Sequence, residues 1–394
     1  MTKTTQYKNT AIGPIPTEWE VKKLGEEFNV TMGQSPNSQF YNTEGIGLPL
    51  IQGNADIVDG KSIIRFYTSQ ITKTCEKDEL IFTVRAPVGE MGIASYVSCL
   101  GRGVCSIKHS NSDSLNYIKF YLESYKDNWS KLSQGSTFEA ISGNELKQFS
   151  FPLPPLPEQQ KIAEVLSTWD KAIQDTDAII KKLEDRNKAL AFSLLRGKMV
   201  SKNSKEIALS KFLTFTPREI DKPTENYLAL GIRSHGKGLF HKPDSDPKAI
   251  AMDKLYEVKE NDFIVNITFA WEHAVAIVGK EDVGGLVSHR FPTYEIDTNQ
   301  VKVEYFRHLI LQPFFRKMLE NISPGGAGRN RVLSKKDLLK LKVLIPTLEE
   351  QDKVAEILNT ANQEVKQYQQ KLEALKLQKK GLMQQLLTGR VRTV

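Results

Sequence analysis

The sequence has few cysteines and no long hydrophobic run. Its 394 residues include three cysteines, Cys75, Cys99 and Cys105, which are too few and too irregularly spaced for a disulfide framework or a zinc site. No apolar stretch reaches the roughly 18 residues of a membrane span, and the polar segment Met1–Thr10 holds no apolar signal core. These absences predict a protein of the reducing cytoplasm without a membrane partner or a bound metal.

Signatures of catalysis are also scarce. The chain has no P-loop of an ATPase, and no glycine-rich cofactor loop followed by the Asn/Asp-Pro-Pro-aromatic motif of adenine methyltransferases. One loose nuclease-like pattern exists, in which Asp244 follows a proline and precedes Glu257 and Lys259. Such carboxylates hold Mg²⁺ in nucleases, and the lysine supports an attacking water. Because the segment around Asp244 is equally typical of a proline-flanked turn, a metal-dependent nuclease is kept only as an alternative.

Positive charge is modest and unevenly distributed. The formal net charge is +7, and residues 1–150 carry 15 Lys and Arg against 16 Asp and Glu, whereas residues 201–345 carry 23 against 18. An excess of this size fits nucleic-acid binding without requiring it. The near-neutral first segment predicts that the chain alone binds DNA weakly and depends on local clusters or a partner for much of the attraction to phosphates.

One segment of the sequence occurs twice. Leu156–Leu166 reappears as Leu348–Leu358, an offset of 192 residues, and the offset holds without a gap as far as Gly197 and Gly389. A match of this length indicates a true internal repeat. Acidic residues at the start of each copy and a glycine at its end are typical of a helix, which would be roughly 58 Å long.

Apolar residues in both copies follow a heptad spacing. Alternation of three and four is typical of a coiled-coil seam, and two helices separated by a whole domain pack most simply as an antiparallel pair. Polar Asn187 and Lys379 interrupt the seam at the same place in each copy, where they either fix the register or reach solvent near a frayed end. The predicted seam residues are Ile162, Leu166, Trp169, Ile173, Ile180, Leu183, Leu190 and Leu194 in the first helix, and Val354, Leu358, Val365, Tyr368, Leu372, Leu375, Leu382 and Leu386 in the second.

The segments between the helices share an order of elements although few of their residues match. Each contains two apolar strands, an amphipathic helix, a loop of small residues, a short helix and a last strand that runs into Pro154 or Pro346. We therefore predict an α/β (α+β) fold, with two similar mixed α/β domains separated by two long helices that form an antiparallel coiled coil in a pseudo-twofold repeat. A common scaffold with differing residues suits two different binding surfaces. The expected boundaries are 1–153 and 201–345 for the domains, and 154–200 and 346–394 for the helices.

These features resemble a known family, the specificity (S, HsdS) subunits of Type I restriction–modification systems. Pro152–Leu166 resembles the central conserved region of that family, residues 346–390 resemble its distal conserved region, and Gly13–Trp19 resembles its opening. Two departures occur: the second half has no counterpart of the opening, and the distal helix begins with Thr347 where a proline stands at the same point of the first copy. Neither departure alters the heptads.

The resemblance implies a function and partners. Each variable domain would be a target-recognition domain that reads one half of a split, asymmetric site in double-stranded DNA, and the helices would set the gap. Two methyltransferase subunits would methylate adenine with S-adenosylmethionine, and two motor-nuclease subunits would use ATP and Mg²⁺ to cleave. The chain itself would bind no cofactor and carry no catalysis. A coiled-coil adaptor that does not bind DNA is the other alternative, but it does not explain two differing domains on one scaffold.

Loops punctuated by glycine and proline supply the candidate DNA contacts. Base edges are read by Arg, Lys, Asn and Gln, and phosphates by Arg, Lys, Ser and Thr. The run Gly325–Arg331 is the best single candidate, because its glycines allow close backbone approach and two arginines follow. The candidates in the first domain are Gln34, Ser35, Gln52, Asn54, Arg85, Arg102, Gln134, Ser136 and Thr137, and those in the second are Arg233, His235, Lys237, His289, Arg290, Arg329, Asn330 and Arg331.

Overall fold

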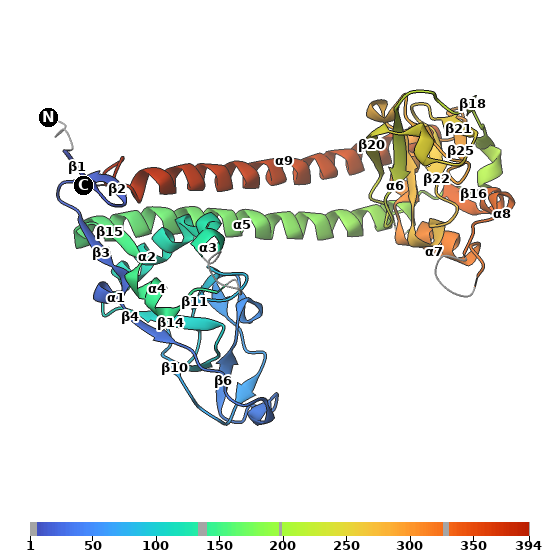
Figure 1. The fold of residues 1–394 in the computed structure, drawn as a ribbon. Helices are drawn as coiled ribbons and strands as arrows, with labels where there is room; N and C mark the ends of the chain where they lie inside the picture. The colour runs from blue at the N-terminus through green and yellow to red at the C-terminus, as the bar shows by residue number, and fades with distance from the viewer. Residues whose placement is uncertain (1–5, 133–139, 197–198, 326–330, 394) are drawn as a thin grey trace. The chain divides into compact units, whose positions relative to one another are not determined.

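The chain forms two compact units. The structure is a computed structural model that describes residues 6–132, 140–196, 199–325 and 331–393. Unit 1 comprises residues 1–177 and 370–394, and unit 2 comprises residues 178–369. Two long helices, α5 (Leu156–Leu195) and α9 (Leu348–Leu386), contribute one half to each unit (Figure 1). The two points of division are 192 residues apart, which is the offset of the sequence repeat.

Unit 1 contains a mixed α/β domain built on two larger sheets. One sheet has the strand order β10-β13-β6-β9-β5, and the other has the order β4-β14-β11-β12-β8-β7; β15 pairs with β3, and β1 with β2. The strands are β1 (Tyr7–Thr10), β2 (Gly13–Pro16), β3 (Glu20–Lys23), β4 (Asn29–Met32), β5 (Tyr41–Asn42), β6 (Leu48–Ile51), β7 (Ile57–Val58), β8 (Lys61–Ser62), β9 (Tyr67–Thr68), β10 (Thr74–Cys75), β11 (Leu80–Thr83), β12 (Met91–Ile93), β13 (Ser98–Leu100), β14 (Val104–Lys108) and β15 (Ser150–Leu153). The helices are α1 (Leu24–Glu27), α2 (Ser112–Ser124), α3 (Lys126–Leu132) and α4 (Gly143–Gln148).

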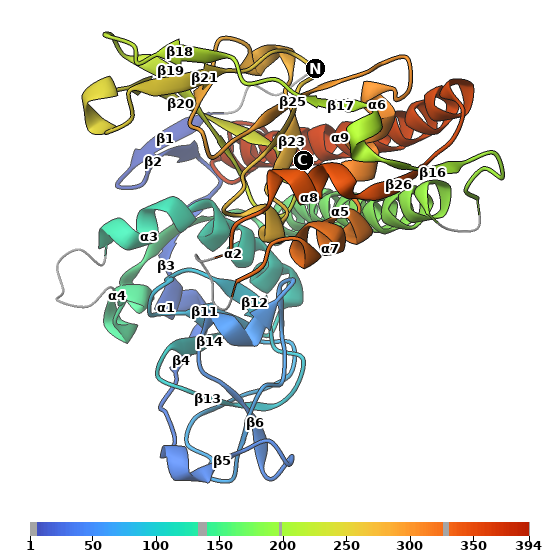
Figure 2. The same ribbon diagram turned by 90° about the vertical axis from the view of Figure 1, so that its right-hand side faces the viewer.

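Unit 2 contains the second mixed α/β domain (Figure 2). Its sheets have the strand orders β18-β21-β24-β19-β20 and β17-β25-β22-β23, and β16 pairs with β26. The strands are β16 (Lys205–Ala208), β17 (Leu213–Phe215), β18 (Glu219–Asp221), β19 (Tyr227–Ile232), β20 (Leu239–Ser245), β21 (Lys254–Glu257), β22 (Phe263–Val265), β23 (Val275–Ile277), β24 (Leu286–Val287), β25 (Thr293–Ile296) and β26 (Lys342–Ile345). The helices are α6 (Val303–Ile310), α7 (Pro313–Asn321) and α8 (Lys335–Lys340).

The two domains have the same topology. The order β10-β13-β6-β9 in unit 1 corresponds to β21-β24-β19-β20 in unit 2, and β4-β14-β11-β12 corresponds to β17-β25-β22-β23. The parallel pair recurs too, because β6 runs parallel to β13 and β19 runs parallel to β24. In each unit the strand before the long helix pairs antiparallel with a strand near the start of the domain. The predicted pair of mixed α/β domains in an internal repeat is therefore confirmed.

The core of each domain is continuous with the helix pair. In unit 1 the cluster of buried side chains that holds Trp19, Phe82 and Phe151 also includes Ile162 from α5 and Leu386 from α9. In unit 2 the corresponding cluster contains Phe263 and Phe306 from the domain, together with residues of both long helices. Burial of apolar area contributes about 25 cal/mol per Å², so helices and domain stabilise one another within each unit.

The long helices run antiparallel within each unit and bury the predicted seam. In unit 1 the Lys379 ammonium lies 2.6 Å from the Asp170 carboxylate, and in unit 2 the Asn187 amide donates to the Ala361 carbonyl at 2.8 Å. All sixteen predicted seam residues are buried or half-buried. At 1.5 Å per residue, α5 with its 40 residues is about 60 Å long.

The polar residues that interrupt the seam are both buried, with exposed fractions of 8% for Asn187 and 6% for Lys379. The interpretation that these side chains reach solvent near a frayed helix end is therefore wrong. The interpretation that they fix the register of the helix pair agrees with their burial. Lys379 also binds Glu123 of α2 at 3.0 Å. Burial lowers the pKa of Lys379, but the Glu123 and Asp170 carboxylates outweigh this effect and raise it above its ordinary value.

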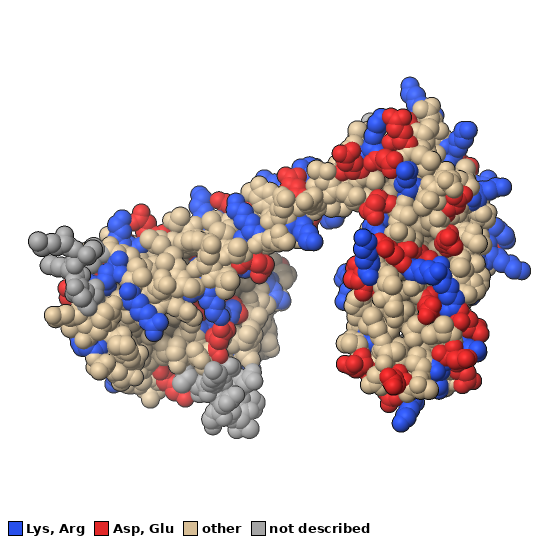
Figure 3. All heavy atoms as spheres, turned by 90° about the horizontal axis from the view of Figure 1, so that it is seen from above, with Lys and Arg blue, Asp and Glu red and all other residues tan. Residues whose placement is uncertain are grey.

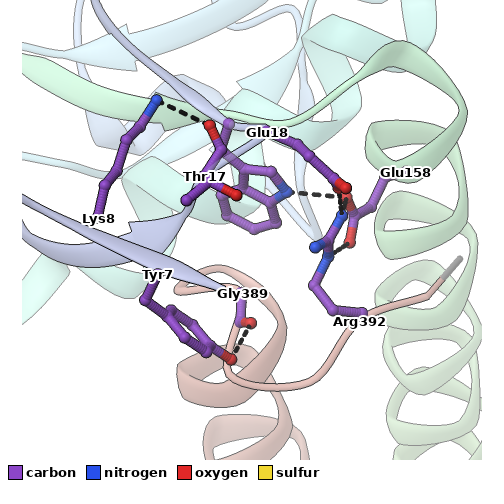
Figure 4. A network of polar contacts seen from close by, with 8 residues as sticks. Tyr7, Lys8, Thr17, Glu18, Glu158, Gly389 and Arg392 are labelled. Atoms are coloured by element: carbon purple, nitrogen blue, oxygen red, sulfur yellow. Dashed lines mark hydrogen bonds and ion pairs between the residues drawn. The ribbon is translucent and has the colours of Figure 1, made fainter. Parts of the chain in front are cut away.

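In unit 1 the start of α5 is bound by the residues that follow α9 (Figure 4). Glu158 in the first turn of α5 is fully buried, and its carboxylate accepts hydrogen bonds from Trp19 at 2.8 Å and from Arg392 at 2.6 and 2.9 Å. The Tyr7 hydroxyl of β1 donates to the carbonyl of Gly389, which lies three residues after the end of α9 and has a left-handed φ of 70°. Glycine adopts a left-handed conformation with less strain than other residues, which agrees with the predicted glycine at the end of this helix. Gly197, its counterpart, lies outside the described residues.

The equivalent position in unit 2 has the same arrangement with different chemistry. Glu350, which lies 192 residues after Glu158, accepts a hydrogen bond from Ser201 at 2.6 Å and another from Asn203 at 3.2 Å, both in the segment that follows α5. These bonds and those of Thr347 hold the pKa of Glu350 down to about 2. The first turn of each long helix is therefore bound by the segment that follows the other long helix. In unit 1 this contact is an ion pair, and in unit 2 it is made by neutral donors.

A separate observation concerns membranes. Within the described ranges, no helix combines the length and the apolar character needed to cross a bilayer.

The buried carboxylate in unit 1 gives a test of this arrangement. We expect Glu158→Gln to lower the free energy of unfolding by about 1–3 kcal/mol, because it leaves Arg392 without its buried counter-charge. Urea unfolding followed by circular dichroism measures the change. Glu350→Gln is the matched control, since its partners are neutral and it should have the smaller effect. Equal effects at the two positions would contradict the role given to the ion pair.

Candidate nucleic-acid interface

The loops that carry most of the first-domain candidates meet at one edge of a sheet. The chain leaves β6 toward Gln52 and leaves β13 toward Arg102, and these strands are parallel neighbours. The carboxyl ends of parallel strands lie at the same edge, so the two loops come together although 50 residues separate them. They line a hollow of about 620 Å³, here called the first hollow. Five of the predicted DNA-binding residues line it: Ser35, Gln52, Asn54, Arg85 and Arg102.

Backbone contacts fix the shape of the first hollow. The buried Asp56 carboxylate accepts hydrogen bonds from the backbone N–H groups of Gln52 at 2.7 Å and Gly53 at 3.1 Å. The Ser35 hydroxyl accepts from the backbone N–H of Arg102 at 3.0 Å. A Cβ at Gly103 would lie 2.2 Å from the Gln52 carbonyl oxygen, so only glycine allows this approach of the two loops.

Side chains in the first hollow present hydrogen-bond donors. The Arg85 and Arg102 side chains are exposed, and neither guanidinium has an ion pair or hydrogen bond with another residue in the described part of the chain. The amide of Gln52 donates to the Tyr41 hydroxyl at 2.9 Å, which fixes its orientation. Free guanidinium groups on a polar surface suit phosphates and guanine edges, which are acceptors.

The remaining first-domain candidates lie elsewhere. Gln34 is exposed, and its backbone bonds to Leu100 and Thr72, but it does not line the first hollow. Gln134, Ser136 and Thr137 lie outside the described residues. Tyr41 was not predicted, since it follows β4 by several residues and only the folded chain brings it to Gln52.

A second hollow occupies the corresponding place in unit 2. There the parallel neighbours are β19 and β24, and the loops that follow them carry Ser234 and Ser288. Together with the loop after β22, which carries Asn266 and Glu272, they surround the second hollow, of about 520 Å³. Its walls are largely apolar, formed by residues that include Leu230, Phe240, Phe269 and Phe291.

The 3-10 helix Ala270–Glu272 is held firmly beside the second hollow. The backbone N–H of His235 donates to the Glu272 carbonyl at 2.7 Å, and that of Gly236 to the His273 carbonyl at 2.9 Å. His273 is buried, with its Nε2 donating to the Ile310 carbonyl at 2.6 Å. Burial lowers the pKa of His273, so the ring remains neutral at pH 7. His235 itself has a φ of 63°, which fixes this tight loop after β19.

The cationic candidates of unit 2 do not line the second hollow. The Arg290 guanidinium donates to the Thr268 hydroxyl at 3.0 Å, and that of Arg331 lies 5.3 Å from the ring centre of Trp271. Arg233 turns back on its own hairpin, donating to the Leu239 carbonyl at 3.1 Å. Lys237 and His289 are exposed. Arg329 and Asn330 lie outside the described residues, so the structure describes Gly325 and Arg331 at the ends of the favoured run but not its centre.

Polar residues that line the second hollow were missed in the sequence, among them Ser234, Asn266, Glu272 and Ser288. A signal for Asn266 and Glu272 existed, because the segment 261–268 matches 78–85 in its pattern of strand and turn. The loop that follows β22 is therefore the counterpart of the loop that carries Arg85. A carboxylate there does not resemble the usual picture of a DNA-binding residue, which is why residue type alone did not point to it.

On the face that Figure 3 draws, positive charge does not form a continuous field. Figure 3 shows Lys and Arg side chains interspersed with Asp and Glu over the face it draws. The net charge of +7 agrees with this mixed pattern. Specific contacts in the hollows are therefore better candidates for recognition than a general attraction to phosphate.

The residues of the nuclease-like pattern lie apart. Asp244 is on β20 and Glu257 is on β21, and β24 and β19 lie between these strands in the sheet. With neighbouring strands about 4.8 Å apart, three steps separate the carboxylates by roughly 14 Å, whereas ligands of one Mg²⁺ lie within about 2.1 Å of it. Within the described ranges no group of three His, Cys, Asp or Glu side chains could hold a metal ion. The residues of the nuclease-like pattern therefore do not form one metal site.

Comparison with known proteins gives relatives of one kind. A chain provisionally named as the type I restriction enzyme MjaX specificity subunit of Methanocaldococcus jannaschii is 38% identical over 196 residues, which are 49% of this chain and 46% of that one. The chain thus spans about half the length of this relative. The MjaVIII specificity subunit of the same organism is 20% identical over 404 residues. The alignment covers 96% of this chain and 94% of that one.

A solved structure supports the fold. The crystal structure of the Type-I restriction-modification system S subunit from M. genitalium matches with a TM-score of 0.55 over 98% of this chain and 99% of that one, at 17% identity. The family described as the Type I restriction modification DNA specificity domain matches twice, at residues 16–185 and 198–377. Each match contains one mixed α/β domain and the greater part of the long helix that follows it. The chain therefore belongs to the family of Type I restriction modification DNA specificity domains.

Proposed function

We propose that this chain is the DNA-specificity subunit of a Type I restriction–modification complex and recognises a split, asymmetric site in double-stranded DNA. The observation that carries the proposal is the pair of hollows: two domains of one topology present different side chains at the same sheet edge. Family membership supports it. Because the two surfaces differ, the two half-sites would differ, unlike the halves of a palindrome read by a symmetric dimer.

The helix pair would set the gap between the half-sites. Half-sites read from one face of DNA are about 34–36 Å apart or a multiple of this distance. Helices about 60 Å long provide enough length for such a spacer. A buried heptad seam with polar residues at fixed positions gives the pair one preferred register, which suits a spacer of constant length.

The chemistry would belong to partner subunits. Two methyltransferase subunits would transfer a methyl group from S-adenosylmethionine to adenine, and two motor-nuclease subunits would cleave DNA with ATP and Mg²⁺. This chain would contribute no catalytic group and would act on DNA in the cytoplasm. The names of the relatives, which are specificity subunits of type I restriction enzymes, support this division of labour. A coiled-coil adaptor without a DNA role leaves the two differing hollows unexplained.

Exchange of one domain tests the modular reading of the target. We expect replacement of residues 15–150 by the same domain of another family member to change one half of the target and leave the other half and the gap unchanged. The physical reason is that each hollow lies within one unit. Adenine methylation mapped at base resolution in cells carrying the complex measures the outcome. A target that stays the same, or changes in both halves, would contradict the proposal.

Lengthening both helices by one heptad tests the spacer. In the pair, Asn187 lies opposite Ala361 and Asp170 lies opposite Lys379, so an insertion after Thr176 is matched by one after Glu373. We expect the gap to lengthen, by at most about three base pairs, because seven residues add about 10.5 Å and a base pair about 3.4 Å. The same heptad inserted in α5 alone is the control, since it disrupts the seam. An unchanged gap with intact methylation would refute the spacer.

A further inference from the structure

Loops that follow corresponding strands border both hollows, but they bring different side chains to them. In unit 1 the loop that follows β11, the strand that corresponds to β22 of unit 2, brings the exposed guanidinium of Arg85 to the first hollow. In unit 2 the loop after β22 brings the carboxylate of Glu272. The corresponding loops thus bring a donor to one hollow and an acceptor to the other, and this difference bears on what each domain reads.

Glu272 is placed to accept one more hydrogen bond. Its Oε2 accepts from the Ser234 hydroxyl at 2.6 Å, and its side chain is half-buried. In the described part of the chain no Lys or Arg lies within ion-pair distance of the carboxylate. Apolar residues form most of the surrounding wall. A half-buried carboxylate beside apolar walls is costly unless donors satisfy its remaining lone pairs, so this group favours a ligand that brings an N–H.

Cations of the second domain contact groups other than Glu272. Arg290 is bonded to Thr268, Arg331 stacks on Trp271, and Arg233 is bonded to its own hairpin. Lys242, which does line the second hollow, has its ammonium 5.4 Å from the ring centre of Phe240. The second hollow thus contains an acceptor, Glu272, and one cation, Lys242, which suits contacts to a base edge and to a phosphate.

The identity of the base follows from the groups exposed in the major groove. Guanine presents two acceptors there, and a carboxylate would repel both. Adenine presents an amino group next to the acceptor N7, so one carboxylate oxygen is satisfied while the other is repelled. Cytosine presents its amino group without an acceptor on its own exposed edge. A carboxylate therefore selects cytosine, whereas the unpaired guanidiniums of Arg85 and Arg102 select guanine in the other half-site.

We propose that Glu272 reads a cytosine in the half-site of the second domain, while Arg85 and Arg102 read guanine in the half-site of the first. The inference rests on the proposed DNA-specificity function. It makes Glu272, fixed by Ser234 and by the rigid 3-10 helix Ala270–Glu272, a specificity-determining residue that contacts the DNA.

The test is selection of DNA by the intact complex. The chain, assembled with its methyltransferase subunits, binds a pool of duplexes with a randomised region, and the recovered DNA is sequenced. We expect the wild type to select a split site with a fixed cytosine in one half. Glu272→Gln adds a donor and removes the charge at nearly constant size, so it should reduce the preference for cytosine at that one position by about tenfold or more. The first-domain half-site should stay unchanged.

Two further variants make the result specific. Glu281→Gln removes an exposed carboxylate from the same domain outside the second hollow, and it should leave both half-sites unchanged. Arg102→Ala should weaken the guanine preference in the other half-site alone. If Glu272→Gln fails to fold by circular dichroism, Glu272→Asp replaces it. That variant keeps the acceptor but withdraws it by one methylene, and it should weaken the preference for cytosine.

The outcomes distinguish the proposed DNA-specificity function from the assignment of Glu272 to a cytosine. A wild-type complex that selects no split site would overturn the proposed function. A split site whose cytosine preference is unaltered in the folded Glu272→Gln or Glu272→Asp variant would overturn the assignment of Glu272 and leave the proposed function standing. The same holds for a split site without a cytosine in the second-domain half.

Discussion

Each long helix carries an apolar stripe along its length, and neither helix can hide that stripe by itself. Burial of the stripe against the other helix and against a domain is the constraint on which the rest of the structure depends. In unit 1 the seam residues Ile162, Leu166 and Leu386 belong to the same buried cluster as Trp19 and Phe151, and unit 2 has the same kind of cluster. A domain therefore cannot move on its helices without exposing its own core. Fixing both recognition surfaces relative to their helices is the structural requirement for a molecule that reads two half-sites at a set spacing.

The seam also shows how a repeat can keep its geometry while its chemistry changes. At one repeat position Asn187 bonds to the facing helix, whereas Lys379 bonds both to the facing helix and to Glu123 of the first domain. At another, Glu158 pairs with an arginine, whereas Glu350 uses a serine and an asparagine. Both pairs satisfy buried or half-buried polar groups in the same places. The hollows follow the same rule, since β6 and β13 correspond to β19 and β24 while the side chains beyond them differ.

Elements whose signal is local were predictable from the sequence. The offset of 192 located both long helices to within a few residues, and apolar strand patterns and amphipathic helix patterns indicated the same order of elements in both domains. Contacts between distant segments were not predictable, because no sequence pattern reports which strands pair. The parallel pairing that brings Gln52 to Arg102 is of this kind, and so is the burial of Lys379 by Glu123. For the same reason the sequence pattern of Asp244 and Glu257 resembled a metal site, although the strand order of the sheet holds these two residues apart. Choosing base-reading candidates by residue type favoured arginines and missed Glu272. Glu272 became a candidate only because the fold places it in the second hollow beside Ser234.

The central claim is that two differing domains on one helix pair read a split, non-palindromic site. The most direct measurement is a base-resolution map of adenine methylation in the genome of the host, compared with the same strain after deletion of the gene for this chain. The account predicts one motif made of two unlike halves with a constant gap, methylated in the parent and unmethylated in the deletion strain. A palindromic or uninterrupted motif, or a methylation pattern that survives the deletion, would contradict it.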